Sequence, residues 1–90
     1  MLGCENMKVE EIIDIAKKNN CIVIAEEFKS GNHYHVICDY LTINGVVITG
    51  ENKVEIKQIN STIYFNCMWI DENDIKELDF TGSRMGYKIL

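Results

Sequence analysis

Residues 54–67, VEIKQINSTIYFNC, carry the pattern that decides the fold. Apolar and polar side chains alternate on each side of Asn60-Ser61, as they do in antiparallel strands that have one buried and one solvated face. Asn and Ser are common in tight turns, and a two-residue loop is the commonest hairpin connection. We therefore predict a β-hairpin with strands at residues 54–59 and 62–70.

The register of this hairpin separates its side chains onto two different faces. A shift of one residue would mix apolar and polar side chains on both faces, so the alternation specifies the register. The predicted pairs on the apolar face are Ile56–Phe65 and Val54–Cys67, and those on the polar face are Lys57–Tyr64 and Glu55–Asn66.

Upstream of the hairpin, β-branched segments alternate with turn residues. Asn44-Gly45 is the strongest short hairpin signal in the chain, because both residue types adopt the positive φ angles of a type I′ turn. Residues 30–32 and 50–52 are further turn signals. Strands are therefore expected at residues 21–28, 33–43 and 46–49.

A helix is expected on each side of the strands. Residues 8–20 place apolar side chains at near-helical spacing, with acids at the start and lysines near the end, which suits the helix dipole. Asn19-Asn20 ends this helix. After the last strand, Asp71 is placed to cap a short C-terminal helix, with Ile70 and Ile75 packing across its first turn.

The expected fold is α+β, with the N-terminal helix packed on a five-stranded antiparallel meander and a short C-terminal helix. The sheet is either curled and open or closed into a small SH3-like barrel. The order of elements resembles that of the RNA-binding Sm and Hfq-like barrels, although no signature residue of that family is matched. The length of 90 residues predicts one domain, with a loose arm at residues 1–6 and a loosely attached tail at 81–90.

Composition indicates a folded protein of the cytoplasm. Apolar residues make up 47% of the chain and charged residues 26%, as in ordinary globular proteins. Its apolar runs are far shorter than the roughly 20 residues of a membrane-spanning helix, and we expect no secretory signal. Abundant Ile, Asn and Lys, one Arg and no Pro are typical of AT-rich coding DNA, as in many phages and plasmids.

Metal binding and catalysis have few candidate residues. His33 and His35 share one strand face with Glu26, and Asp39 lies nearby in sequence, but a metal site needs three or four converging ligands. We expect no metal or cofactor there. The four cysteines lack C-x-x-C spacing, so free buried thiols are expected. Sequence motifs for a phosphate loop or a nucleophile elbow are missing, which favours a non-enzymatic role.

The charge pattern disfavours direct nucleic-acid binding, which depends on Lys and Arg, because the net charge is −5. Residues 71–79 contain five acids and one lysine, a net of −4, and the rest of the chain contributes −1. Such an acidic edge attracts basic partner surfaces, although acids at a helix start are also stabilising without any partner. The candidate partner-binding acids are Asp71, Glu72, Asp74, Glu77 and Asp79.

Aromatic and sulfur side chains in the last strand give a second candidate surface. Trp69 continues the apolar face and is expected in the core. Tyr64 and Met68 are expected together on the opposite face, where they are either covered by a helix or exposed as a contact patch for a partner or a second copy of the chain.

These features favour a small non-catalytic binding protein that acts through a protein–protein surface. The size, the coding bias and the acidic edge suit a phage- or plasmid-encoded inhibitor of a host-defence nuclease, of the anti-CRISPR or anti-restriction type, whose partner has a basic surface. The alternative is an SH3-like or Sm-like accessory module that binds a peptide or RNA.

Overall fold

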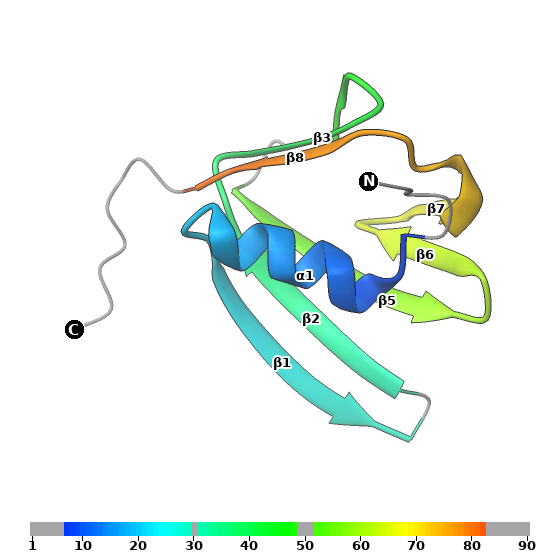
Figure 1. Ribbon diagram of the computed structural model, residues 1–90. Helices are drawn as coiled ribbons and strands as arrows, with labels where there is room; N and C mark the ends of the chain where they lie inside the picture. Colours follow the sequence, from blue (N-terminus) through cyan, green and yellow to red (C-terminus); the bar gives the residue numbers. More distant parts are fainter. Residues whose placement is uncertain (1–6, 30, 49–51, 83–90) are drawn as a thin grey trace.

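The computed structural model describes residues 7–29, 31–48 and 52–82 (Figure 1). Its elements confirm the α+β class. They are α1 (Val9–Lys18), β1 (Ile22–Phe28), β2 (Gly31–Ile37), β3 (Tyr40–Ile43), β4 (Val46–Val47), β5 (Lys53–Ile59), β6 (Thr62–Phe65), β7 (Met68–Asp71), the 3₁₀ turn η1 (Glu72–Asp74) and β8 (Leu78–Thr81). The predicted arm and residues 83–90 of the predicted tail lie outside the described residues.

The helix α1 forms where its apolar spacing predicts it. Val9, Ile12, Ile13 and Ala16 recur on one side and are buried, while the acids of the first turn and the lysines of the last turn lie outside. The Glu11 carboxylate accepts the Lys8 backbone N–H at 3.0 Å. The helix ends at Asn19 and Asn20, as expected, and Asn20 adopts a φ of 66°.

The strands form two antiparallel sheets instead of one meander. Their orders are β1-β2-β5-β6-β7 and β4-β3-β8, and neither sheet closes into a barrel. The predicted five-stranded meander is therefore wrong in its connections, and the SH3-like barrel is wrong. The five-stranded sheet with a helix packed across one face is the part of the prediction that holds.

The predicted strand at residues 33–43 breaks at Cys38-Asp39, and this break creates the second sheet. The Cys38 N–H bonds to the Asn52 carbonyl at 3.1 Å, and the Asp39 N–H bonds to the Thr81 carbonyl at 2.8 Å. Because the backbone changes partners here, β2 stays beside β5 while β3 pairs with β8.

Both hairpins with a clear turn signal are confirmed. Asn44 and Gly45 adopt φ angles of 52° and 81°, as a type I′ turn requires, and join β3 to β4. The turn after β5 places Ile56 opposite Phe65 and Lys57 opposite Tyr64, which is the predicted register.

The predicted strand at residues 62–70 is wrong, because it folds back at Asn66-Cys67. Both residues have positive φ angles, 45° and 83°, so β7 returns antiparallel to β6. Asn66 stays beside Glu55, as predicted, since its side-chain Oδ1 accepts the Glu55 N–H at 2.7 Å. The predicted pair of Val54 with Cys67 does not form on a buried face: Val54 is buried and Cys67 is exposed.

The predicted C-terminal helix is only the single 3₁₀ turn η1. Asp71 caps it as expected, with its carboxylate accepting the Asn73 N–H at 2.8 Å. The helix does not continue, because the Asn44 side-chain oxygen accepts the N–H groups of Lys76 and Glu77, at 2.8 and 3.0 Å. The chain then extends into β8.

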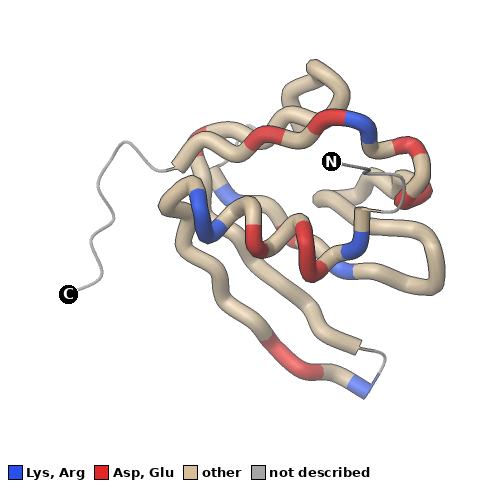
Figure 2. Tube along the Cα trace, viewed as in Figure 1, with Lys and Arg blue, Asp and Glu red and all other residues tan. Residues whose placement is uncertain are grey.

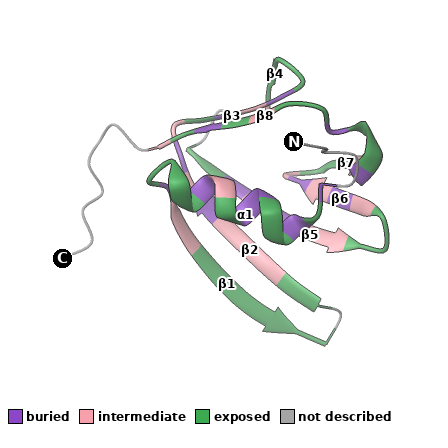
Figure 3. Cartoon of the chain, in the orientation of Figure 1, coloured by how far each residue is buried: buried purple, intermediate pink, exposed green. Residues whose placement is uncertain are grey.

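The core lies between the five-stranded sheet, α1 and the smaller sheet. Buried positions follow one face of β2, β5 and β6 and the inward side of α1 (Figure 3). Leu41, Ile43 and Phe80 complete this cluster from the smaller sheet. The far half of the β1–β2 hairpin extends beyond α1 and is exposed in β1 (Figures 1 and 3).

Candidate functional site

The side of the five-stranded sheet that points away from the core is half-buried to exposed in the described residues. We call this surface, formed by alternate residues of β1, β2, β5, β6 and β7, the open face. None of its residues in these strands is buried, whereas the other side of β2, β5 and β6 supplies the core. Antiparallel sheets often have one solvated face, but such a face is normally polar.

Exposed apolar side chains gather on the open face. Trp69 is 49% exposed and Phe28 50% exposed. Ile24 and Ile59 are similarly exposed on the same side of the sheet. The prediction of Trp69 in the core is therefore wrong: the turn at Asn66-Cys67 resets the alternation, so Trp69 lies opposite Tyr64.

A continuous row of side chains crosses all five strands. It consists of register partners, one from each strand: Glu26, His33, Lys57, Tyr64 and Trp69. The Tyr64 and Trp69 rings lie 4.9 Å apart, and the Lys57 ammonium lies 4.8 Å from the Tyr64 ring centre and 5.8 Å from that of Trp69. These contacts order the aromatic end of the row.

Two histidine–glutamate pairs cross the other half of the open face. His33 Nε2 lies 3.1 Å from the Glu55 carboxylate, and His35 Nε2 lies 3.5 Å from that of Glu26. His33 Nε2 forms no hydrogen bond with the described residues, so this contact is one of proximity. Phe28 packs edge-on against His33, with ring centres 4.8 Å apart.

The histidines share a face with Glu26, as predicted from strand alternation. Within residues 7–29, 31–48 and 52–82, however, no group of three His, Cys, Asp or Glu side chains is arranged to hold a metal ion. The proposed partner Asp39 lies beyond the end of β2, at the strand break.

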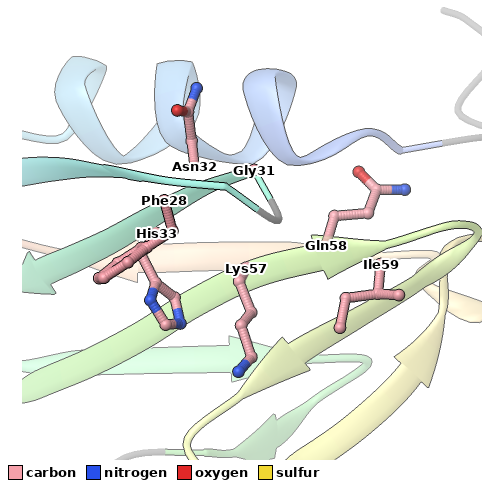
Figure 4. A pocket seen from close by; sticks show the side chains of 7 residues that line it. All are labelled: Phe28, Gly31, Asn32, His33, Lys57, Gln58 and Ile59. Carbon is pink, nitrogen blue, oxygen red and sulfur yellow. The ribbon is translucent and has the colours of Figure 1, made fainter.

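Two hollows lie beside the row. A small one of about 30 Å³ opens where β2 and β5 separate beyond the His33–Lys57 pair. Figure 4 shows Phe28, His33, Lys57 and Ile59 on the open-face side of this hollow, with Asn32 and Gln58 directed toward the helix side.

The larger hollow, about 440 Å³, has a mixed polar lining of His35, Ile48, Lys53, Glu55, Tyr64, Asn66 and Cys67. Within it the Tyr64 hydroxyl donates to the Cys67 thiol at 3.8 Å. This hydrogen bond is the largest of the causes that raise the pKa of Tyr64. Burial and the charges of Cys67 and Glu55 raise it further.

The predicted pair of Tyr64 and Met68 is separated by the fold. Tyr64 is half-buried on the open face, and Met68 lies opposite Phe65 on the other side of the sheet, at the exposed edge. Trp69 and Ile59 are not predicted on this surface. Strand alternation does place Ile24 and Phe28 on the face of Glu26 and the histidines, since each lies two residues from Glu26, but it gives no reason to single them out as contact residues.

The acidic edge divides into inward and outward carboxylates. Glu72 is only 6% exposed, and its carboxylate accepts Gln58 Nε2 at 2.7 Å and pairs with Lys8 Nζ at 3.2 Å. The Asp71 carboxylate caps η1. Asp74, Glu77 and Asp79 are exposed, and in the described part of the chain their carboxylates form no hydrogen bond or ion pair.

Acidic residues also line α1, which contacts β8 (Figure 2). Both elements also carry exposed lysines, Lys17 and Lys18 in α1 and Lys76 before β8. The open face carries three acids, Glu26, Glu55 and Asp71, and two lysines, Lys53 and Lys57.

Cys21 and Cys38 are neighbouring buried free thiols, as expected, while Cys67 is free but exposed. The pKa of Cys38 is raised to about 12, mainly by burial and to a smaller extent by the neighbouring Cys21 thiol. A thiol held in its protonated form is a poor nucleophile.

No helix in the described ranges is long and apolar enough to cross a membrane. No protein-family model, curated protein or solved structure significantly matches the chain.

Proposed function

We propose that this chain is a non-catalytic binding protein whose open face contacts a protein partner. The observation that carries the proposal is the row of Glu26, His33, Lys57, Tyr64 and Trp69, with exposed apolar side chains beside it. Several large apolar side chains exposed on one sheet face are typical of an interaction surface, and Trp and Tyr are enriched among the residues that dominate the binding energy of protein interfaces.

The composition of the row favours a protein over a nucleic acid. Its two aromatic rings could stack on bases, but the two lysines of the open face are outnumbered by Glu26, Glu55 and Asp71, and the chain as a whole has a net charge of −5. A nucleic-acid surface needs an excess of positive charge to bind phosphates. A protein surface tolerates a face of mixed charge and uses its charges for orientation.

Within this class, the partner we favour is a host-defence nuclease with a basic surface, which the chain would inhibit by occupying that surface. The support is the AT-rich coding bias together with the outward carboxylates of Asp74, Glu77 and Asp79, which have no partner in the described chain. Inhibition of the nuclease in a cleavage assay, relieved in a variant that neutralises these three acids, tests this narrower proposal.

The broader proposal is tested by a Phe28→Ser/Trp69→Ser variant. A partner captured from the source cells is purified, and its affinity is measured against the wild-type and variant chains. Loss of both aromatic rings should weaken binding by at least about tenfold, which corresponds to about 1.4 kcal/mol.

The matched control is Val46→Ser, which removes an exposed apolar side chain from β4, away from the open face. Circular dichroism confirms that both variants fold. Equal affinities for the wild-type and double-variant chains would contradict the role of the open face. A short single-stranded RNA that quenches Trp69 fluorescence at physiological salt would instead assign the face to nucleic acid.

A further inference from the structure

The outer edge of β1, which pairs with no strand among the described residues, is a second feature of the same surface, and its interpretation rests on the proposed function. Within the described ranges β1 pairs with β2 alone, and its seven residues make it the longest edge strand there. The other edge strands, β7, β4 and β8, have four, two and four residues. The register from Ile22–Ile37 to Phe28–Gly31 has no bulge, and the sequence has no proline.

Natural proteins usually protect such an edge from pairing with another chain. They use prolines, bulges, short strands, charged side chains or a covering element, and in the described chain β1 has of these only the charged side chains of Glu26 and Glu27. In β1, every residue from Ile24 to Phe28 is exposed, so the far half of the strand is accessible on both of its faces as well as along its edge. The backbone N–H and C=O groups of this edge are thus a template for an additional strand.

The charges of β1 specify what can pair with it. Glu26 projects to the open face and Glu27 to the opposite side, because adjacent strand residues alternate. β1 contains no basic residue, and Lys29 lies beyond its end. An incoming strand therefore meets one carboxylate on each face of the sheet.

A second copy of the chain does not satisfy these charges. An antiparallel β1–β1 pair centred on Ala25 would place each Glu26 opposite Ile24 and each Glu27 opposite Val23 of the other copy. A pair centred on Glu26 or Glu27 would place two carboxylates opposite each other, which is unfavourable. In these registers the strand from the second copy brings no cation, and the register that would place Lys29 opposite Glu26 pairs only residues 26–29.

We propose that the edge of β1 binds an extended segment of the protein partner as an additional strand, and that this segment carries two adjacent basic residues. In an antiparallel arrangement, these two residues lie opposite Glu26 and Glu27. On the open-face side, the partner residues two positions before and two positions after the one opposite Glu26 lie opposite Phe28 and Ile24. Apolar side chains suit these two positions. The expected pattern is apolar, basic, basic, any residue, apolar.

A synthetic peptide with this pattern, TVKKTVT, is the probe. It is titrated at low salt into isotopically labelled full-length protein, and amide shifts and hydrogen exchange are followed by NMR. Strand addition should protect every second amide of β1, because alternate N–H groups of an edge strand point outward. Binding without this alternate protection would overturn the proposal.

Charge recognition is tested with two variants of equal charge change. Glu26→Gln/Glu27→Gln should weaken TVKKTVT binding about tenfold or more, while Glu10→Gln/Asp14→Gln on the exposed side of α1 should not. The peptide TVQQTVT should bind the wild-type chain as weakly as TVKKTVT binds the first variant. Equal effects of the two variants would refute specific recognition by β1.

The outcomes also separate this inference from the proposed function. If TVKKTVT leaves β1 unprotected but Phe28→Ser/Trp69→Ser still abolishes binding of the captured partner, the open face acts without strand addition and only this inference fails. If the aromatic variant has no effect on partner binding, the proposed function fails, whatever the peptide does.

Discussion

Replacing Glu72 with alanine should destabilise the fold far more than replacing a neighbouring acid. Glu72 belongs to an acidic segment, yet its carboxylate faces inward and joins two distant parts of the chain. One oxygen accepts Gln58 Nε2 at 2.7 Å, and the other pairs with Lys8 Nζ at 3.2 Å. Gln58 in turn accepts the Val9 N–H at 3.0 Å, so the network holds the start of α1 against β5 and η1.

The magnitude follows from these two contacts. A hydrogen bond to a charged group contributes about 1.5–3 kcal/mol. The Lys8 side chain is 53% exposed, so its ion pair adds at most about 1 kcal/mol. Gln58 Nε2 keeps its second acceptor, the Asn60 carbonyl at 2.9 Å, which limits the loss. Glu72→Ala should therefore lower the free energy of unfolding by about 2–3 kcal/mol.

Urea unfolding followed by tryptophan fluorescence measures this change. With a urea dependence of about 1.5 kcal/mol per molar, the midpoint should fall by roughly 1.5–2 M. The control Glu77→Ala removes the same charge from an exposed site and should change stability by no more than about 0.5 kcal/mol. Glu72→Gln, which keeps an acceptor for Gln58, should lie between them. Equal midpoints for the two alanine variants would refute the inward role of Glu72.

Three further measurements test other parts of the structure. Cys67→Gly should raise the free energy of unfolding by about 1 kcal/mol, because glycine adopts the φ of 83° without strain. Cys67→Ala, the control, should give no such gain in the same urea experiment. At pH 8, a thiol reagent should label the exposed Cys67 rapidly and Cys38 only on unfolding. The reason is that burial and the neighbouring thiol raise the pKa of Cys38 to about 12. Labelling is followed by mass spectrometry, and equal rates for the two cysteines would contradict this. Asn44→Gly keeps the turn conformation but removes three side-chain hydrogen bonds, and should cost about 1–3 kcal/mol, measured by thermal or urea unfolding.

The local pattern of apolar, charged and turn residues predicts a helix or hairpin correctly when the residues that specify it are contiguous in sequence. The helix over residues 9–18 follows from the apolar spacing and the terminal charges, and it packs as expected. The hairpins at Asn44-Gly45 and Asn60-Ser61 follow from turn residues flanked by alternating side chains. In each case the spacing and the turn residues that specify the element are contiguous, although distant contacts such as those of Asn44 with residues 74–77 add to its stability.

The two mispredicted strands fail for a different reason. The break at Cys38-Asp39 is stabilised by carbonyls of Asn52 and Thr81, which are distant in sequence. The turn at Asn66-Cys67 lacks a glycine, and cysteine rarely adopts a positive φ. The side chain of Asn66 compensates by bonding to the backbone of β5, and only the folded sheet supplies that partner.

The candidate site shows the same limit. The sequence predicts Lys57 opposite Tyr64 and His33 on the face of Glu26, and both hold. The Glu26–His33 pair and the Lys57–Tyr64 pair form one row only because β2 lies beside β5. That neighbourhood requires β3 and β4, which lie between them in sequence, to belong to the other sheet. Trp69 joins the row only because β7 turns back on β6.

The frequent asparagines connect these observations. In the described chain, six residues other than glycine have positive φ, and five of them are asparagines, at positions 20, 44, 52, 60 and 66. Asparagine tolerates this conformation better than other side chains that have a Cβ, because its amide bonds locally to the backbone. The abundance of asparagine that suggests AT-rich coding therefore also has a structural use, since asparagine fills five of the six positive-φ positions that glycine does not occupy in the described chain. The turn at Asn60 sets the Lys57–Tyr64 register, and the turn at Asn66 brings Trp69 to that pair. The open face thus depends on asparagine conformations as directly as on the aromatic side chains it displays.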